Sequence, residues 1–180
     1  KGVSPVPLLV VDIGNARTKV SIFSGYSVRF TTSLSLCAKQ FTEAVATSLR
    51  VDAGKAEEFK RHYGLFTPED ALGQEVFQAM IPVATDFIAQ IVKYMGYYET
   101  HLPHQHLDKP QKKIKKIVLC GGGANLKGLH EFLTRSLKVE VVVGNPWINI
   151  LPSNTKELPL ISFQESLQYS TALGLALRGS

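Results

Sequence analysis

Cysteine is scarce in this sequence, and the scarcity narrows the class of protein. The chain has two cysteines, Cys37 and Cys120, which lie far apart among apolar or glycine neighbours. Their number and spacing exclude a disulfide framework and a zinc site built from paired cysteines. Reduced thiols are typical of the cytosol, so we expect a cytoplasmic protein.

Long hydrophobic runs are also missing. The apolar stretches at residues 8–11 and 139–143 are far shorter than the ~20 residues that cross a bilayer. The sequence therefore predicts a chain with no transmembrane segment.

Acidic residues are fewer than basic ones, with 15 Asp and Glu against 20 Lys and Arg and a net charge of +5. Much of the excess lies in lysines within residues 109–116. No aromatic residues are interleaved with these lysines and no nucleic-acid motif contains them, so we expect a solvated linker and no nucleic-acid partner. An acidic partner or an anionic membrane surface stays open as an alternative.

The remaining composition is that of a globular protein, with 44% apolar and 19% charged residues. A chain of 180 residues can form one sizeable domain or two small lobes that share a core. We expect residues 1–7 to be a disordered lead-in and residues 8–180 to be folded. Within the folded part, residues 38–113 predict a smaller helical subdomain that ends in a flexible loop at 97–113.

Hydrophobic periodicity predicts the order of the elements. Three strands in an antiparallel meander come first, two short helices and one long helix follow, and then come a buried strand, a helix, a strand and a last helix. Pro82 predicts a kink or a restart in the long helix, and Thr67 is its predicted N-terminal cap. The small residues Ala172, Gly174 and Ala176 would let the last helix pack closely on a neighbouring element. The expected ranges are 8–13, 18–24 and 27–36 for the meander, 38–49 and 53–63 for the short helices, and 116–120, 126–137, 139–143 and 166–178 for the final elements.

The turn after the first strand is one candidate ligand loop. Gly14 lets the backbone approach a ligand, and the turn N–H groups and the Thr18 hydroxyl could face an anion. Asp12, at the end of the strand, could hold a metal-bound water. An ordinary hairpin, in which Asp12 and Asn15 only satisfy the turn, is the alternative.

Three consecutive glycines form the second candidate. Gly121, Gly122 and Gly123 follow a buried strand and precede Asn125 and an amphipathic helix. Without side chains, their backbone can lie directly against a flat or anionic ligand at the start of the helix. A tight strand-to-helix connection that needs only small residues is the alternative.

Four motifs occur in a fixed order along the chain. They are Asp12-Ile13-Gly14 with Thr18, Ala56-Glu57-Glu58-Phe59-Lys60, Leu119-Cys120-Gly121-Gly122-Gly123-Ala124-Asn125-Leu126, and Ala172-Leu173-Gly174-Leu175-Ala176. Together they resemble the C-terminal half of the actin-like ATPases, over nearly the whole chain. Among these proteins the chain looks most like the PilM family of type IV pilus assembly proteins, relatives of the cell-division protein FtsA.

The resemblance implies an α/β fold, the ribonuclease-H-like second lobe of an actin-like ATPase at residues 8–180. Its sheet would combine the antiparallel meander with parallel strands, flanked by helices. The cofactor would be ATP or ADP with Mg, between two lobes. The resemblance implies three sets of site residues. The second phosphate loop would contain Asp12, Gly14, Asn15 and Thr18, and Asp12 would reach Mg through water. Glu57 and Lys60 would lie near the ribose and adenine, and the adenosine loop would contain Gly121, Gly122, Gly123 and Asn125.

The same resemblance sets expectations for activity and partners. Complete relatives carry a first phosphate loop that has no counterpart in this sequence, so we do not expect the chain to hydrolyse ATP alone, and no catalytic residue is assigned. Family partners would be PilN-like inner-membrane assembly proteins, with the protein cytoplasmic and peripheral at the bacterial inner membrane. A second copy or a complementary first lobe could cover exposed surface. The alternative function is a non-catalytic scaffold lobe that dimerises or binds partners.

Overall fold

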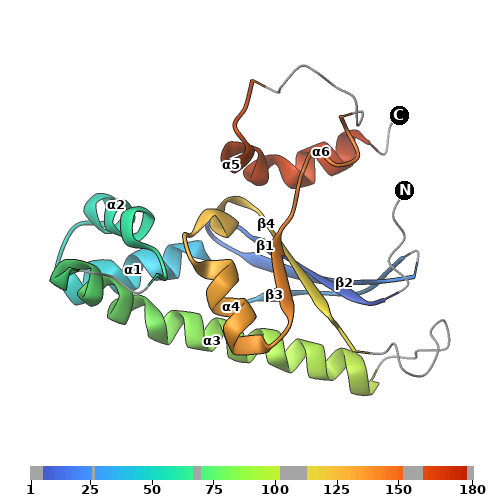
Figure 1. Cartoon of the computed structure of the whole chain (residues 1–180), viewed down its shortest axis with the longest axis horizontal. Coiled ribbons are helices and arrows are strands. Elements are labelled where there is room, and N and C mark those ends of the chain that lie inside the picture. Colours follow the sequence, from blue (N-terminus) through green and yellow to red (C-terminus); the bar gives the residue numbers. More distant parts are fainter. Residues whose placement is uncertain (1–5, 26, 67–69, 102–112, 152–159, 178–180) are drawn as a thin grey trace.

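A computed structural model describes residues 6–25, 27–66, 70–101, 113–151 and 160–177, and its centre is a five-stranded mixed sheet (Figure 1). The strand order is β3-β2-β1-β4-β5. The first three strands pair antiparallel, whereas β1 with β4 and β4 with β5 pair parallel. The predicted mixed sheet is therefore confirmed. The strands are β1 (Leu8–Ile13), β2 (Thr18–Ser24), β3 (Ser27–Leu34), β4 (Lys116–Cys120) and β5 (Glu140–Val143).

Strand register brings the two predicted ligand loops together. β1 and β4 run in the same direction, and Asp12 lies opposite Cys120. The turn after β1 and the glycines after β4 therefore lie at the same end of the strands, the carboxyl end of β1 and β4. β1 is fixed in the core, since its Leu9, Val11 and Ile13 are almost completely buried.

Two short helices follow the meander at this edge, α1 (Ala38–Leu49) and α2 (Ala53–Tyr63). The Asp52 side chain caps α2 by accepting from the backbone N–H of Lys55, and Gly64 ends the helix with a positive φ of +64°. Both helices have the predicted bounds.

The long helix α3 (Ala71–His101) is continuous through Pro82, so the predicted restart does not occur. It begins where the Asp70 carboxylate accepts from the backbone N–H of Gly73; the predicted threonine cap at residue 67 lies outside the described residues. The helix also runs past residue 97. The predicted loop is thus wrong for 97–101, while residues 102–112 lie outside the described part.

Aromatic packing explains why α3 extends beyond the expected end. Tyr98 is buried, and the rings of Tyr94 and Tyr97 lie 5.8 and 5.5 Å from that of Phe30 on β3. Tyr97 also stacks on His101 at 4.8 Å. These contacts hold the last turns of the helix against the sheet, so polar composition alone misplaced its end.

α3 is also long and apolar enough to cross a membrane by length and composition, with a mean hydropathy of 1.3 in its most apolar stretch. The sequence prediction did not identify it because short polar interruptions divide the run. Its Val76, Met80, Phe87 and Ile91 lie in the protein core, at the spacing of one helix face. Asp86 is exposed on the other side. One face of α3 is therefore buried in the protein, and 28% of its most apolar stretch is buried.

The C-terminal part differs in detail from the predictions. The 3-10 helix η2 (Gly122–Asn125) comes directly after β4, and α4 (Leu129–Leu137) starts three residues later than expected. The single predicted last helix is divided into α5 (Phe163–Ser166), the 3-10 turn η3 (Leu167–Tyr169) and α6 (Ser170–Ala176). Figure 1 shows α5 and α6 standing apart from α3 on the opposite side of the sheet.

Two further predictions are corrected by burial. Pro7, placed in the disordered lead-in, is buried next to β1, while residues 1–5 lie outside the described part. The small residues of the last helix were expected to pack closely on a neighbouring element, but α6 buries no side chain and Gly174 has open space around it. α6 therefore leaves most of its side chains exposed.

Candidate functional site

Two glycines of the β4 turn are required by packing against β1. Gly121 has a φ of +79°, and a Cβ atom there would lie 2.3 Å from Asp12 Oδ1. A Cβ atom at Gly123 would lie 2.3 Å from Ile13 Cγ2. Both distances are far below van der Waals contact, so a side chain at either position would push the turn away from β1.

Gly122, between them, has no such requirement. A Cβ atom there would meet nothing nearer than Gln168 Cβ at 3.8 Å, an ordinary contact, and its φ lies outside the left-handed region. The fold would therefore accept alanine at this position. Gly122 lines a cavity, which Gln168 also lines.

The opposite side of the cavity is a network of charged and polar groups on α1 and α2. Lys60 Nζ is 2.6 Å from Glu57 Oε2 and donates to Thr42 Oγ1 at 2.9 Å. The Thr42 hydroxyl in turn donates to Glu57 Oε2 at 2.6 Å, and Arg61 Nε lies 2.9 Å from Glu57 Oε1. Lys60 is 8% exposed, so its ammonium is held inside this network.

These contacts fix the ionisation of Glu57. Burial raises the pKa of its carboxyl, but hydrogen bonds from Lys60, Thr42 and Arg61 outweigh burial and lower the pKa to about 2. Glu57 is therefore an anion throughout the physiological range. An ionised carboxylate at a cavity wall can accept hydrogen bonds from ligand hydroxyl groups.

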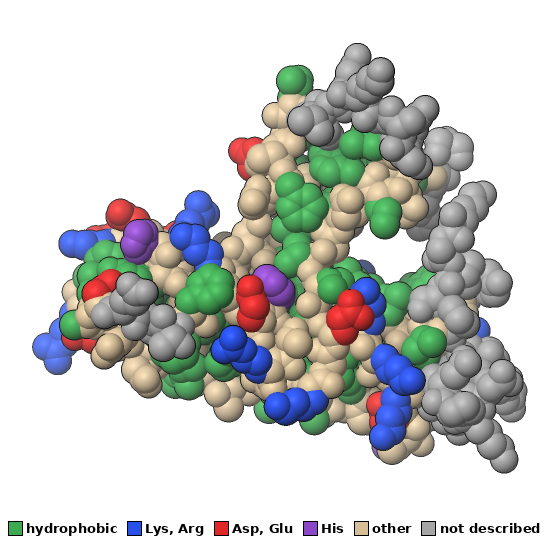
Figure 2. Space-filling view, in the orientation of Figure 1, with side chains coloured by type: hydrophobic (Ala, Val, Ile, Leu, Met, Phe, Trp, Pro, Cys, Tyr) green, Lys and Arg blue, Asp and Glu red, His purple; other side chains and the backbone are tan. Residues whose placement is uncertain are grey.

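The segment formed by α5, η3 and α6 supplies the third side of the cavity. Asn125 Nδ2 donates to the backbone oxygen of Gln164 at 2.8 Å, and the backbone N–H of Gly121 donates to the oxygen of Leu167 at 3.2 Å. These bonds hold α5 and η3 across the glycine turn. Figure 2 shows the resulting notch between α2 and the arm formed by α5 and α6.

The three sides enclose a cavity of about 570 Å³, within the range of small-molecule sites. It brings together six of the ten predicted site residues: Asn15, Glu57, Lys60, Gly122, Gly123 and Asn125. Sequence reasoning missed Arg61, Lys127, Gln164, Glu165 and Gln168, which also line it. Arg61 directly follows the Glu57 motif and could have been found there, whereas the two glutamines lie in a segment without a recognisable pattern.

The other four predicted residues lie beside the cavity. Gly121 and Gly14 shape the turns; the Gly14 N–H donates to the oxygen of Arg17 at 2.9 Å. Thr18 is completely buried on the core face of β2, and its hydroxyl has no hydrogen-bond partner among the described residues. Asp12 is half-buried, and its Oδ2 accepts from the Thr171 hydroxyl at 3.3 Å.

Asp12 lies at the end of β1, in the turn that the resemblance assigns to phosphate binding. The described residues contain no group of three or more His, Cys, Asp or Glu arranged to hold a metal ion. One carboxylate at a strand end suits Mg²⁺ that keeps its waters and is carried by a phosphate ligand. Cys120 is not a nucleophile here, because burial and the charge of Asp12 raise its pKa to about 12.

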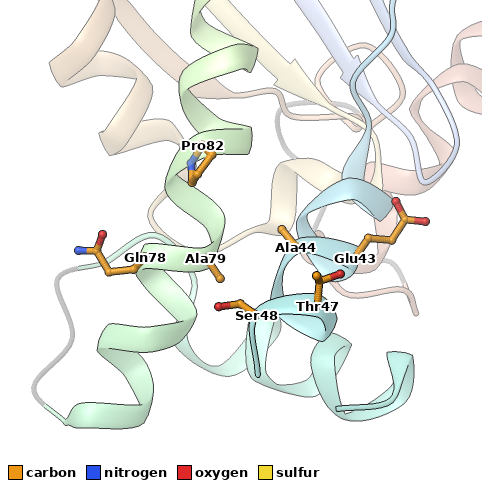
Figure 3. Close-up of a pocket in the computed structure, with 7 residues that line it drawn as sticks. All are labelled: Glu43, Ala44, Thr47, Ser48, Gln78, Ala79 and Pro82. Carbon is orange, nitrogen blue, oxygen red and sulfur yellow. The ribbon is translucent and has the colours of Figure 1, made fainter. Parts of the chain in front are cut away.

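A second concavity lies between α1 and α3 (Figure 3). It is a shallow groove of about 550 Å³ lined by Glu43, Ala44, Thr47, Ser48, Gln78, Ala79 and Pro82. Glu43 is paired with Lys39 at 3.0 Å. None of the predicted site residues lies in this groove.

Solved structures define the class of the fold. MreB5 of Spiroplasma citri bound to ADP superposes with a TM-score of 0.68, covering 96% of this chain and 53% of that chain at 13% identity. A PilM-PilN type IV pilus biogenesis complex superposes with a TM-score of 0.77, covering 97% of this chain and 46% of that chain at 30% identity. The chain thus has the fold of one lobe of an actin-like protein.

Sequence comparison gives the family within this class. FtsA of Staphylococcus epidermidis is 27% identical over 148 residues, which cover 76% of this chain and 32% of FtsA. The family "Type IV pilus assembly protein PilM" matches residues 4–180. The chain belongs to the PilM family, and it spans about half the length of the PilM chain of known structure and a third of FtsA.

Proposed function

We propose that the chain is the nucleotide-binding half of a cytoplasmic PilM-family protein that supports assembly of a type IV pilus or a related secretion system. The observation that carries this proposal is Gly122. Its two neighbours are glycines because β1 leaves no room for a side chain, whereas nothing in the fold requires glycine at 122. A flat ligand that lies against the backbone supplies the missing reason.

The cavity residues suit ATP or ADP. The base would lie on the backbone of Gly122 and Gly123, and the ionised Glu57 would accept hydrogen bonds from ribose hydroxyl groups. Lys60, enclosed by Glu57 and Thr42, would act mainly by holding Glu57 in place. The phosphates would extend toward Asn15 and the turn after β1, where Asp12 could meet Mg²⁺ through water.

In this proposal the chain holds the nucleotide, and hydrolysis would need groups from outside the chain. The Thr18 hydroxyl is buried and does not line the cavity. We propose that a first lobe completes the phosphate site in the whole protein. The similarity to a PilM-PilN complex supports a PilN-like partner, and with it a peripheral location at the inner membrane.

Substitution of Gly122 tests the site with little effect on the fold. Gly122→Ala should lower the affinity for Mg-ADP at least tenfold in calorimetry at millimolar nucleotide, because the methyl group occupies the base surface. Its melting temperature should stay within about 2 °C of wild type, since the added Cβ makes only ordinary contacts.

Gly123→Ala is the matched control, because the same methyl group one residue later collides with Ile13 and should lower the melting temperature clearly. Equal Mg-ADP affinity in wild type and Gly122→Ala would contradict the proposal. So would the absence of any nucleotide binding, both in the chain alone and in a mixture with the first lobe of a relative.

One observation favours a second function, a scaffold lobe that binds a partner without hydrolysing ATP. Four large apolar side chains of the C-terminal segment are 41–60% exposed: Phe163, Tyr169, Leu175 and Leu177. An uncovered apolar group of this kind is typical of an association surface. Its partner would be a complementary first lobe or a second copy of the chain.

A further inference from the structure

The C-terminal segment, residues 163–176, has a small anchor in the core. Ser166 and Leu167 are 0% and 1% exposed, whereas α6 buries nothing. An isolated helix of this length is not stable in water, so its position depends on the attachments that it makes.

Three hydrogen bonds add to the anchor, and all three end on predicted nucleotide-site residues. The Gly121 N–H donates to the Leu167 oxygen, the Thr171 hydroxyl donates to Asp12, and the Asn125 amide donates to the Gln164 oxygen. The bond from Asn125 is the shortest at 2.8 Å, against 3.2 and 3.3 Å for the other two.

The position of α5 decides which side chains reach the cavity. Gln164, Glu165 and Gln168 line it opposite α2, and Gln168 Cβ lies above Gly122. A glutamine amide offers a donor and an acceptor side by side, as does the edge of a purine base. The wall formed by α5 and η3 is thus suited to the rim of a base whose face lies on the glycine turn.

We infer that Asn125 is a positioning residue that holds this wall in place, and that Gln164 and Gln168 are the residues that contact the edge of the bound base. This inference rests on the proposed nucleotide site. It reassigns Asn125 from direct contact with adenosine to support of the C-terminal segment, through the hydrogen bond to Gln164. It also makes the last part of the sequence a component of the site.

Hydrogen exchange of the 180-residue chain without nucleotide tests the positioning role. Asn125→Asp keeps the size and an acceptor oxygen but removes the donor. Amide exchange at residues 163–176 should become about five- to tenfold faster, as expected from the loss of one hydrogen bond. Asn15→Asp makes the same chemical change in the same cavity, away from α5, and should leave exchange in this segment unchanged. Equal exchange in wild type and Asn125→Asp would overturn the positioning role.

Mg-ADP provides the second measurement. Nucleotide should slow exchange at residues 163–168 in wild type and do so much less in Asn125→Asp. Gln168→Ala, at an exposed position, should weaken binding of Mg-ADP at least threefold without changing exchange in the nucleotide-free chain. Unchanged affinity in Gln168→Ala would overturn the base contact. If wild type binds no nucleotide, either alone or mixed with the first lobe of a relative, the proposed function fails, while the nucleotide-free exchange still decides the role of Asn125.

Discussion

At the scale of single residues, Glu57 shows how a predicted ligand contact is also a structural group. Its carboxylate joins α1 to α2 through Thr42 and Lys60 and also holds Arg61. The sequence motif could predict that Glu57 and Lys60 share a helix face, because they are three residues apart. It could not predict Thr42, which comes from another helix.

The lowered pKa of Glu57 gives a pH-dependent prediction. The folded pKa of about 2 lies below the ordinary value of 4.5, so the ionised carboxylate stabilises the fold above pH 4.5, and this stabilisation is lost as the pH falls toward 2. Glu57→Gln should melt a few degrees below wild type at pH 7, and the difference should shrink below pH 4.5. Glu58→Gln, at an exposed neighbour, is the control, and a difference for Glu57→Gln that is independent of pH would contradict the prediction.

Thr18 and Thr42 are two buried threonines that differ in the hydrogen bonding of their hydroxyl groups. Both side chains are buried, but the Thr42 hydroxyl has two hydrogen-bond partners, whereas that of Thr18 has none among the described residues. Thr18→Val should raise the free energy of unfolding by about 1 kcal/mol, since it removes an unsatisfied buried hydroxyl. Thr42→Val should lower it. Thermal melting measures both, and a lower melting temperature for Thr18→Val would show that its hydroxyl has a partner.

At the scale of elements, two glycines with positive φ join the end of α2 to the start of α4. Gly64 has a φ of +64°, and a Cβ atom there would lie 2.4 Å from the oxygen of Lys127, which accepts from the N–H of Leu65 at 2.7 Å. Gly128 has a φ of +75° and approaches Leu65 from the other side. This junction fixes α2, and with it one wall of the cavity.

Substitution of either glycine at the junction should therefore lower the free energy of unfolding. Gly64→Ala should lower the free energy of unfolding by about 1–3 kcal/mol from its backbone conformation, with a further loss from the collision. Gly96→Ala is the control, because Gly96 lies in α3 with open space around it, and this substitution should raise the free energy by about 0.5–1 kcal/mol. Denaturant unfolding measures both, and similar values for the two variants would exclude the junction as a constraint.

Sequence patterns predicted an element best when capping residues mark both of its ends. Asp52 and Gly64 mark both ends of α2, and the structure places them there. The end of α3 was misplaced because long-range contacts with Phe30 determine it, and the last helix was divided because Leu167 is drawn into the core. Neither cause is visible within a short window of sequence.

At the scale of the whole molecule, the predicted fold is confirmed, and six of the ten predicted site residues line one cavity. The order of four motifs was enough to place the glycine turn and the α2 motif around one cavity, because strand register and short connections bring them together. The third wall could not be predicted from the sequence, because the hydrogen bond that holds Gln164 comes from Asn125, 39 residues earlier in the chain.

At this scale we predict that a first lobe binds this chain and completes the nucleotide site. A separate chain that corresponds to the first half of a PilM-family relative should increase the affinity of this chain for Mg-ATP in calorimetry, because it would supply the other phosphate contacts. Leu175→Glu should prevent this effect by placing a charge on α6. Val28→Glu, at an equally exposed position on β3, should not. Equal effects of the two substitutions would exclude α6 as the contact surface.

The hydrogen bond between Thr171 and Asp12 also bears on the order of events during synthesis. It joins residues 159 positions apart, so the strand end that carries Asp12 leaves the ribosome long before the helix that contacts it. β1, the meander and the glycine turn can assemble while residues 163–176 are still being translated. Until then the cavity lacks one wall, and the nucleotide that we propose it binds would stabilise a nascent chain little. Chaperones and the chain's own core would have to protect it until the last segment docks.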